Sequence, residues 1–110
     1  MNFDISASPN FSRELKRLSK KYPSIKADLL ELIISLNDNP FQGDSLGKDC
    51  FKVRMKITSK GKGKSGGSRV ITCVKILDKH IKLLSIYDKS EQEAISDSLL
   101  MQLLIESGLI

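Results

Sequence analysis

The apolar and polar positions of this chain follow two different periods in two regions. Over residues 9–22 and again over residues 24–36, apolar side chains recur every three to four positions, which is typical of amphipathic helices. Ser8 and the proline after it form a favourable helix start, and Pro23 separates the two segments. The pattern therefore predicts a helical hairpin, preceded by a short strand over residues 2–7.

After a loop rich in turn residues at 41–47, the period changes from 3.6 to two. Apolar residues alternate with cations over residues 51–57, so a strand here would send four apolar side chains to one side and Lys52, Arg54 and Lys56 to the other. Three like charges about 7 Å apart along a strand repel one another. An anionic ligand would offset that cost, so this alternation indicates a binding strand.

The remaining pattern predicts two more strands and a last helix. Residues 69–76 contain a β-branched run and residues 81–88 form the next strand, with a tight turn between them. Residues 97–106 form a helix with Ser96 as its N-cap and Gly108 as its stop. Its apolar positions cover more than one helical stripe, so part of that surface is available to a partner, unless all of it packs on the sheet.

Together these elements predict one α+β domain over residues 1–110. The expected fold has a short N-terminal strand, a helical hairpin, a three-stranded antiparallel meander and a C-terminal helix. A chain of 110 residues with 40% hydrophobic residues is long enough for one modest core.

The charge is concentrated in the middle of the chain. The net charge is +5, but residues 48–89 alone carry twelve Lys or Arg against three Asp, a local net charge of +9. The last twenty-one residues are acidic. Such a distribution favours a polyanionic partner, most plausibly nucleic acid, over the alternative of a lysine-rich surface that is only solvated.

Several classes of protein are excluded by simple counts. Gly63-Lys64-Ser65 matches the end of a nucleotide-binding P-loop, but Thr58 stands where the pattern needs glycine, and a β-branched run follows in place of a helix. Cys50, Cys73 and a single histidine are too few and too scattered for a zinc site, so we expect no metal ion and no cofactor. The cysteines are expected to be reduced thiols in or beside strands.

No apolar run is long enough to span a membrane, and no secretory leader is visible, which favours a cytoplasmic protein without a membrane partner.

Three segments resemble signature blocks of the RelE/HigB group of bacterial toxins, in the same order and spacing: residues 50–56, 59–72 and 84–91. The resemblance, which spans almost the whole chain, places it in the RelE/ParE superfamily. It implies the toxin of a type II toxin-antitoxin module, a ribosome-dependent mRNA endonuclease that inhibits translation. It also implies a cognate antitoxin as partner, ribosome and mRNA as targets, and binding of the toxin-antitoxin complex to its own operator DNA through the antitoxin.

The resemblance also implies roles for individual residues. Arg69 matches the arginine that contacts the scissile phosphate, and the other candidate catalytic residues are Arg54, Lys56, Tyr87 and Lys89. Lys52 belongs to the same basic strand, and the loop lysines can neutralise RNA phosphates without reading sequence; the predicted RNA-binding residues are Lys52, Lys60, Lys62 and Lys64.

The chain departs from the group at two positions that concern proton transfer. Ser90 stands where other members carry a second arginine, and no tyrosine or histidine lies near the C-terminus. Tyr87, or Lys56 or Lys89 with a lowered pKa, is then left to move the proton, whereas His80 is expected at an exposed turn. Two alternatives remain open: a ParE-type inhibitor of DNA gyrase, and a non-catalytic member that only binds antitoxin or RNA.

Overall fold

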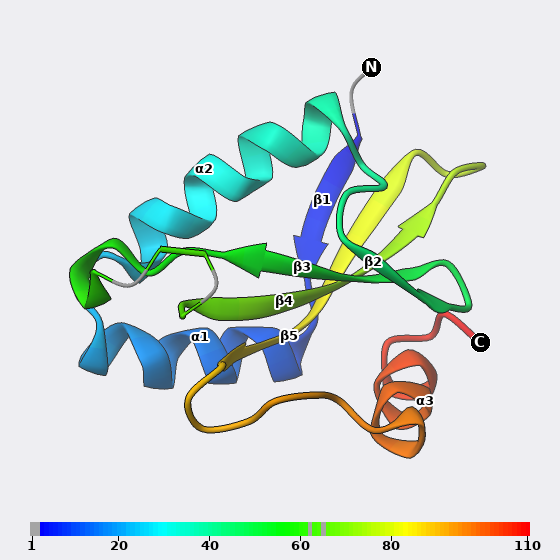
Figure 1. Ribbon diagram of the computed structural model, residues 1–110. Coiled ribbons are helices and arrows are strands. Elements are labelled where there is room, and N and C mark those ends of the chain that lie inside the picture. The colour runs from blue at the N-terminus through cyan, green and yellow to red at the C-terminus, as the bar shows by residue number, and fades with distance from the viewer. Residues whose placement is uncertain (1–2, 62, 65) are drawn as a thin grey trace.

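The computed structural model describes residues 3–61, 63–64 and 66–110, and these form three α-helices and a five-stranded sheet (Figure 1). The elements follow the chain in this order: β1 (Asp4–Ala7), α1 (Pro9–Lys21), α2 (Ile25–Asp38), β2 (Asp44–Gly47), β3 (Cys50–Met55), the 3-10 turn η1 (Thr58–Lys60), β4 (Ser68–Lys75), β5 (His80–Asp88) and α3 (Asp97–Glu106).

The strands lie in the order β1-β5-β4-β3-β2. The segment from β3 to β5 is the antiparallel meander that the sequence predicts, and β1 lies parallel to β5 at one edge. The α+β class is confirmed. The strand β2 was missed, because residues 41–47 were predicted to be a loop. Only a few residues of β2 pair with β3, with an irregularity between Ser45 and Gly47, and so short a strand shows no readable period.

The ends of the helices confirm the predicted caps. Ser8 Oγ accepts a hydrogen bond from the backbone N–H of Phe11, and Ser96 Oγ accepts one from that of Leu99. Beyond α3 the backbone turns at Gly108, whose φ is 71°.

Two apolar clusters lie on opposite faces of the sheet. Helices α1 and α2 cover one face, where Phe11, Leu18 and Leu36 join the apolar side of β3. Helix α3 covers the other face through Leu100, Leu103 and Leu104 (Figure 1). Because side chains alternate along a strand, a residue on β3 to β5 belongs to one of these faces only.

The alternation predicted for β3 is confirmed. Val53, Met55 and Ile57 are buried in the cluster beneath α1 and α2, with Phe51 packed against it. Cys50 and Cys73, predicted as thiols in or beside strands, face each other across β3 and β4 on the α3 side and are fully buried free cysteines.

The position predicted for His80 was wrong. It is half-buried at the start of β5, and its Nε2 lies 2.8 Å from Ser6 Oγ on β1. The parallel pairing of β1 with β5 places the two residues together, and a contact between segments so distant in the chain leaves no local pattern.

Candidate functional site

Three of the predicted site residues form a row across the sheet. Arg54 on β3 lies opposite Arg69 on β4, and Arg69 lies opposite Tyr87 on β5. Cross-strand partners project from the same face, and Tyr87 belongs to the α3-side cluster, so all three side chains are on that face. Arg54 is exposed, whereas Arg69 and Tyr87 retain only 4% and 2% of their accessible surface.

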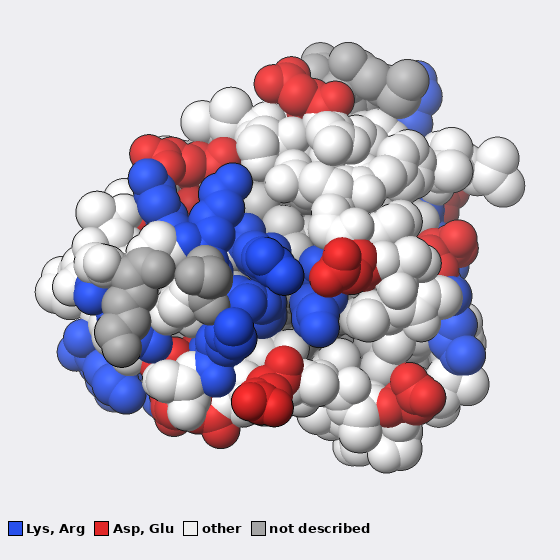
Figure 2. Space-filling view, viewed as in Figure 1, with Lys and Arg blue, Asp and Glu red and all other residues white. Residues whose placement is uncertain are grey.

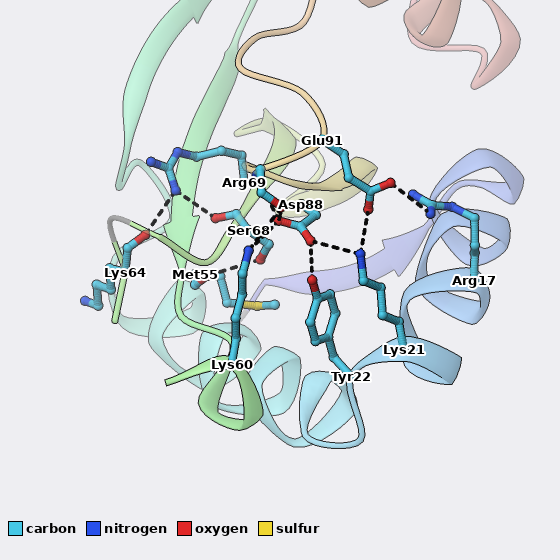
Figure 3. Close-up of polar contacts among 11 residues, drawn as sticks. Arg17, Lys21, Tyr22, Met55, Lys60, Lys64, Ser68, Arg69, Asp88 and Glu91 are labelled. Carbon is cyan, nitrogen blue, oxygen red and sulfur yellow. Dashed lines mark hydrogen bonds and ion pairs between the residues drawn. The ribbon is translucent and has the colours of Figure 1, made fainter. Parts of the chain in front are cut away.

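Arg69 is held by backbone carbonyls at the start of β4. Its Nη1 donates hydrogen bonds to the carbonyl oxygens of Lys64 at 3.0 Å and Ser68 at 3.1 Å (Figure 3). The first of these bonds also fixes the loop that leads into β4. The guanidinium is therefore oriented by the backbone, which is how a cation is kept in place for a ligand.

Tyr87 carries a buried hydroxyl that makes no hydrogen bond with any described residue. Burial raises the pKa of this phenol, and the positive charge of Arg69 opposes the rise only in part. Tyr87 is therefore a neutral phenol at physiological pH, able to donate a proton but poorly suited to accept one. A buried polar atom without a partner is uncommon and requires an explanation, and a ligand is one.

The remaining predicted cations surround this row at the surface. Figure 2 shows Lys and Arg gathered over β3 and the loop before β4, with Asp and Glu at the border. Lys52 is half-buried opposite Asp44 of β2, and Lys56 is exposed with its Nζ 4.0 Å from Glu31 of α2. Lys64 is exposed. The cations thus lie on a surface open to solvent.

Two hollows, of about 320 and 220 Å³, open along the edge of β3 and have Gln42, Arg54 and Lys64 in common. The larger extends toward α2 and includes Lys56, and the smaller extends toward β2 and includes Lys52. Carboxylates also line the hollows, Asp28 and Glu31 in the larger and Asp44 in the smaller. A strand of nucleic acid following this edge would therefore meet the cations of both hollows between acidic side chains.

Lys60, predicted to bind RNA phosphate, instead contacts a buried carboxylate of the protein. Its side chain is only 13% exposed, and its Nζ lies 2.7 Å from Oδ1 of Asp88, whose side chain is fully buried. The same oxygen accepts from the backbone N–H and the hydroxyl of Ser90, while Tyr22 donates to the other (Figure 3). Burial alone would raise the pKa of Asp88, but these hydrogen bonds lower it well below its usual range.

Sequence reasoning missed this cluster around Asp88. A signal was present, since an acid that ends an apolar strand needs a partner when buried. Neither Tyr22 nor Lys60 is near Asp88 in the chain, however, so the partners could not be named.

The loop between β3 and β4 is fixed at both ends. At its start, the backbone N–H of Thr58 donates to Oδ2 of buried Asp28 at 2.9 Å, and the Thr58 hydroxyl donates to Oδ1. At its end, the backbone N–H of Lys89 donates to the carbonyl of Gly67 at 3.0 Å. A Cβ at Gly67 would lie 2.4 Å from the carbonyl oxygen of Met55, so only glycine fits this approach.

Two predicted residues remain to be placed. Lys89 is exposed directly after β5, beside the row that contains Tyr87. Lys62 lies outside the described residues. Across the described part of the chain, no group of three His, Cys, Asp or Glu side chains could hold a metal ion. In the same part, no helix is long and apolar enough to cross a membrane.

The fold matches solved structures of toxins. A free E. coli RelE toxin with two arginines replaced by alanine superposes with a TM-score of 0.60 at 18% identity, covering 84% of this chain and 90% of that one. The Mycobacterium tuberculosis RelBE2 toxin-antitoxin complex gives 0.60 at 15% identity, with 80% and 99% covered. The intact E. coli RelBE toxin-antitoxin complex gives 0.61 at 15%, with 78% and 95% covered. No protein-family model and no curated protein matches the sequence. The chain thus has the fold of RelE toxins.

Proposed function

We propose that this chain is the toxin of a toxin-antitoxin pair and that it cuts messenger RNA on the ribosome. Its fold is that of RelE toxins, some of which were solved in complex with an antitoxin. The observation that carries the proposal is the row Arg54, Arg69 and Tyr87. It combines two guanidinium groups with a phenol hydroxyl that has no hydrogen-bond partner in the described part of the chain.

The proposed reaction is attack by a ribose 2′-oxygen on the neighbouring phosphorus. The new O2′–P bond forms while the P–O5′ bond breaks, which leaves a 2′,3′-cyclic phosphate and a 5′-hydroxyl. Negative charge builds up on the phosphate oxygens and on the leaving oxygen in the transition state. Fixed cations aimed at those oxygens stabilise this state more than the ground state.

The two arginines supply those cations at different depths. Arg54 is exposed and meets a phosphate first, whereas Arg69 lies beneath the surface. For the Nη1 of Arg69 to bind the phosphate, a phosphate oxygen replaces the carbonyl of Lys64 as acceptor. The exchange replaces a hydrogen bond from the guanidinium to a neutral carbonyl with one between two ions, which is the stronger of the two.

Proton transfer involves two groups with different demands. The leaving 5′-oxygen needs a proton, and the phenol of Tyr87 can donate one because it is protonated at neutral pH, although its raised pKa makes it a weaker acid than an exposed tyrosine. The 2′-hydroxyl must lose a proton to a base, for which Lys56 and Lys89 are the candidates near the site. Lys52 and Lys64 hold the flanking phosphates.

The test is primer extension on a defined message, with and without purified ribosomes. The same protein sample is also tested in a DNA gyrase supercoiling assay. We expect new 5′ ends only when ribosomes are present. Cleavage of free message would remove the ribosome from the proposal. Gyrase inhibition without RNA cleavage would assign a ParE-type activity, and binding without either activity would assign a non-catalytic member.

A further inference from the structure

A second group of cations lies on the other side of the molecule, on the outer face of α1. All of its basic residues are exposed: Arg13, Lys16, Arg17, Lys20 and Lys21. The inner face of α1 packs through Phe11 and Leu18 into the cluster on the α1 and α2 side of the sheet. The row of Arg54, Arg69 and Tyr87 projects from the opposite face of the sheet. The two groups of cations approach each other at the end of α1, where Lys21 Nζ lies 4.0 Å from Oδ2 of Asp88, the carboxylate that also pairs with Lys60.

The only acidic residue of α1 does not balance this charge. Glu14 turns inward, where its Oε1 accepts from Ser85 Oγ at 2.8 Å and from Asn10 Nδ2 at 2.7 Å. Glu91, beyond β5, pairs with Arg17 at 3.4 Å and Lys21 at 3.8 Å (Figure 3). Among the described residues, no ion pair involves Arg13, Lys16 or Lys20.

The like charges along α1 repel one another, and the packing of the helix gives no reason for them. Lys16 and Lys20 are four residues apart, as are Arg13 and Arg17, and like charges at this spacing destabilise a helix. The helix dipole favours Lys20 in the last turn of α1 but does not offset the repulsion between Arg13 and Arg17. An anionic ligand along the outer face would remove the repulsion.

The composition of this face indicates nucleic acid and not protein as the ligand. Protein interfaces have an apolar centre, yet none of the exposed large hydrophobic residues of the described chain lies on α1. A phosphate backbone needs only cations. Along α1 the cations recur every three to four residues, about 5 to 6 Å along the axis, comparable with the separation of neighbouring phosphates on an RNA strand.

We propose that the outer face of α1 is a second RNA-binding surface that docks on the phosphate backbone of ribosomal RNA while the site on the α3 side holds the message. The inference rests on the proposed function, because a ribosome is the particle that presents folded RNA on two sides of a bound protein. The smallest dimension of the molecule is 22 Å, and the two surfaces lie on opposite faces of the sheet. A short single strand of RNA can bind only one of the two basic surfaces at a time. A cleft in a ribosome can bind the outer face of α1 and the α3-side site together.

The test compares two double variants that each remove two exposed cations. Lys16→Gln with Lys20→Gln changes the outer face of α1 and keeps helix propensity. Lys48→Asn with Lys79→Asn is the matched control at the β2–β3 and β4–β5 turns, where asparagine tolerates the positive φ values of 54° and 48°. Binding to 70S ribosomes and to a short single-stranded oligoribonucleotide is measured over a series of salt concentrations.

We expect the α1 variant to bind ribosomes on the order of tenfold more weakly at 0.1 M salt, with a log–log salt slope shallower by about 1.5, because two phosphate contacts are lost. Its binding to the oligoribonucleotide should be unchanged, and the control should resemble the unmodified protein in both assays. Equal loss in the control, equal loss on the oligoribonucleotide, or no loss on ribosomes would overturn the inference.

The proposed function fails in a different assay. If the unmodified protein binds ribosomes through α1 but yields no new 5′ ends, the proposal of mRNA cleavage is rejected and the proposal of RNA binding by α1 is kept. If the protein cleaves mRNA and the α1 variant cleaves and binds like the unmodified protein, the proposal of RNA binding by α1 is rejected and that of cleavage is kept.

Discussion

Arg69 and Tyr87 lie directly opposite each other on β4 and β5, and both side chains are almost completely buried on the face of the sheet that carries α3. The Tyr87 hydroxyl has no hydrogen-bond partner among the described residues, and such a hydroxyl is costly to bury. Proteins retain such costs mainly where they serve a ligand or a reaction, and each of the two residues can be tested separately.

Replacing Arg69 should remove cleavage. Arg69→Ala deletes a fixed donor to the transition state, and we expect a loss of about 10²- to 10³-fold in kcat. Arg69→Lys should recover little, because an ammonium cannot reproduce the planar fork. Primer extension with ribosomes measures the rate, and urea unfolding checks that both variants fold. Undiminished cleavage by folded Arg69→Ala would show that the site is elsewhere.

Replacing Tyr87 by phenylalanine should change stability and activity in opposite directions. The buried hydroxyl makes no hydrogen bond to any residue that the structure describes, so Tyr87→Phe should stabilise the fold by about 1 kcal/mol. Cleavage should fall by about 10²-fold or more if the phenol donates the proton to the leaving oxygen. Urea unfolding and single-turnover cleavage measure the two effects. A stabilised variant with full activity would leave Tyr87 without a chemical role.

The two loop lysines Lys60 and Lys64 should behave differently. Lys60→Met leaves the buried carboxylate of Asp88 without its nearest counter-charge and should lower the free energy of unfolding by about 3 kcal/mol. Lys64→Met removes an exposed ammonium and should change it by less than about 0.5 kcal/mol. Equilibrium urea unfolding measures both. Equal effects would mean that Lys60 is a surface cation and that its contact with Asp88 contributes nothing.

Stability should fall in acid because of two buried carboxyl groups. Burial would raise the pKa of Asp28, but its hydrogen bonds from Thr58 and Ser24 lower it, and the pKa of Asp88 is lowered in the same way. The unfolded chain therefore binds protons first, from about pH 4 downward. The stabilisation is complete at pH 7 and is lost as the pH falls from about 4 through the folded-state pKa values.

Urea unfolding at pH 7, 4 and 3 measures this acid dependence. Asp88→Asn should be less stable than the unmodified protein at pH 7 and should lose less stability between pH 4 and pH 3. If the variant and the unmodified protein lose equal stability over that interval, Asp88 is not the group that titrates.

Helix α3 should become protected when an antitoxin binds. The side chains of Leu99, Met101 and Ile105 remain exposed, at 39%, 39% and 60%, on a helix that packs on the sheet through its other apolar face. Hydrogen exchange at residues 97–106 should slow in a co-expressed toxin-antitoxin complex, and the melting temperature should rise by mass action. Unchanged exchange over this helix would place the antitoxin elsewhere.

The sequence predicted those features of the fold and the site that depend on residues close together in the chain. The helices, their caps and the apolar side of β3 follow from the spacing of residues next to one another in the chain, because period and capping are local properties. Alternation places Lys52 and Arg54 on one face without any knowledge of the partner strands.

By itself, the sequence determined the element order from β3 to α3 and the basic face of one strand. Only the tertiary structure decided which side chains meet. The register of β3, β4 and β5 brings Arg54, Arg69 and Tyr87 into one row, and folding makes Lys60 a counter-ion of Asp88 and not an exposed cation. The reason is physical: burial and pairing depend on segments that are far apart in the chain, and a charge in the sequence does not specify which opposite charge will lie beside it.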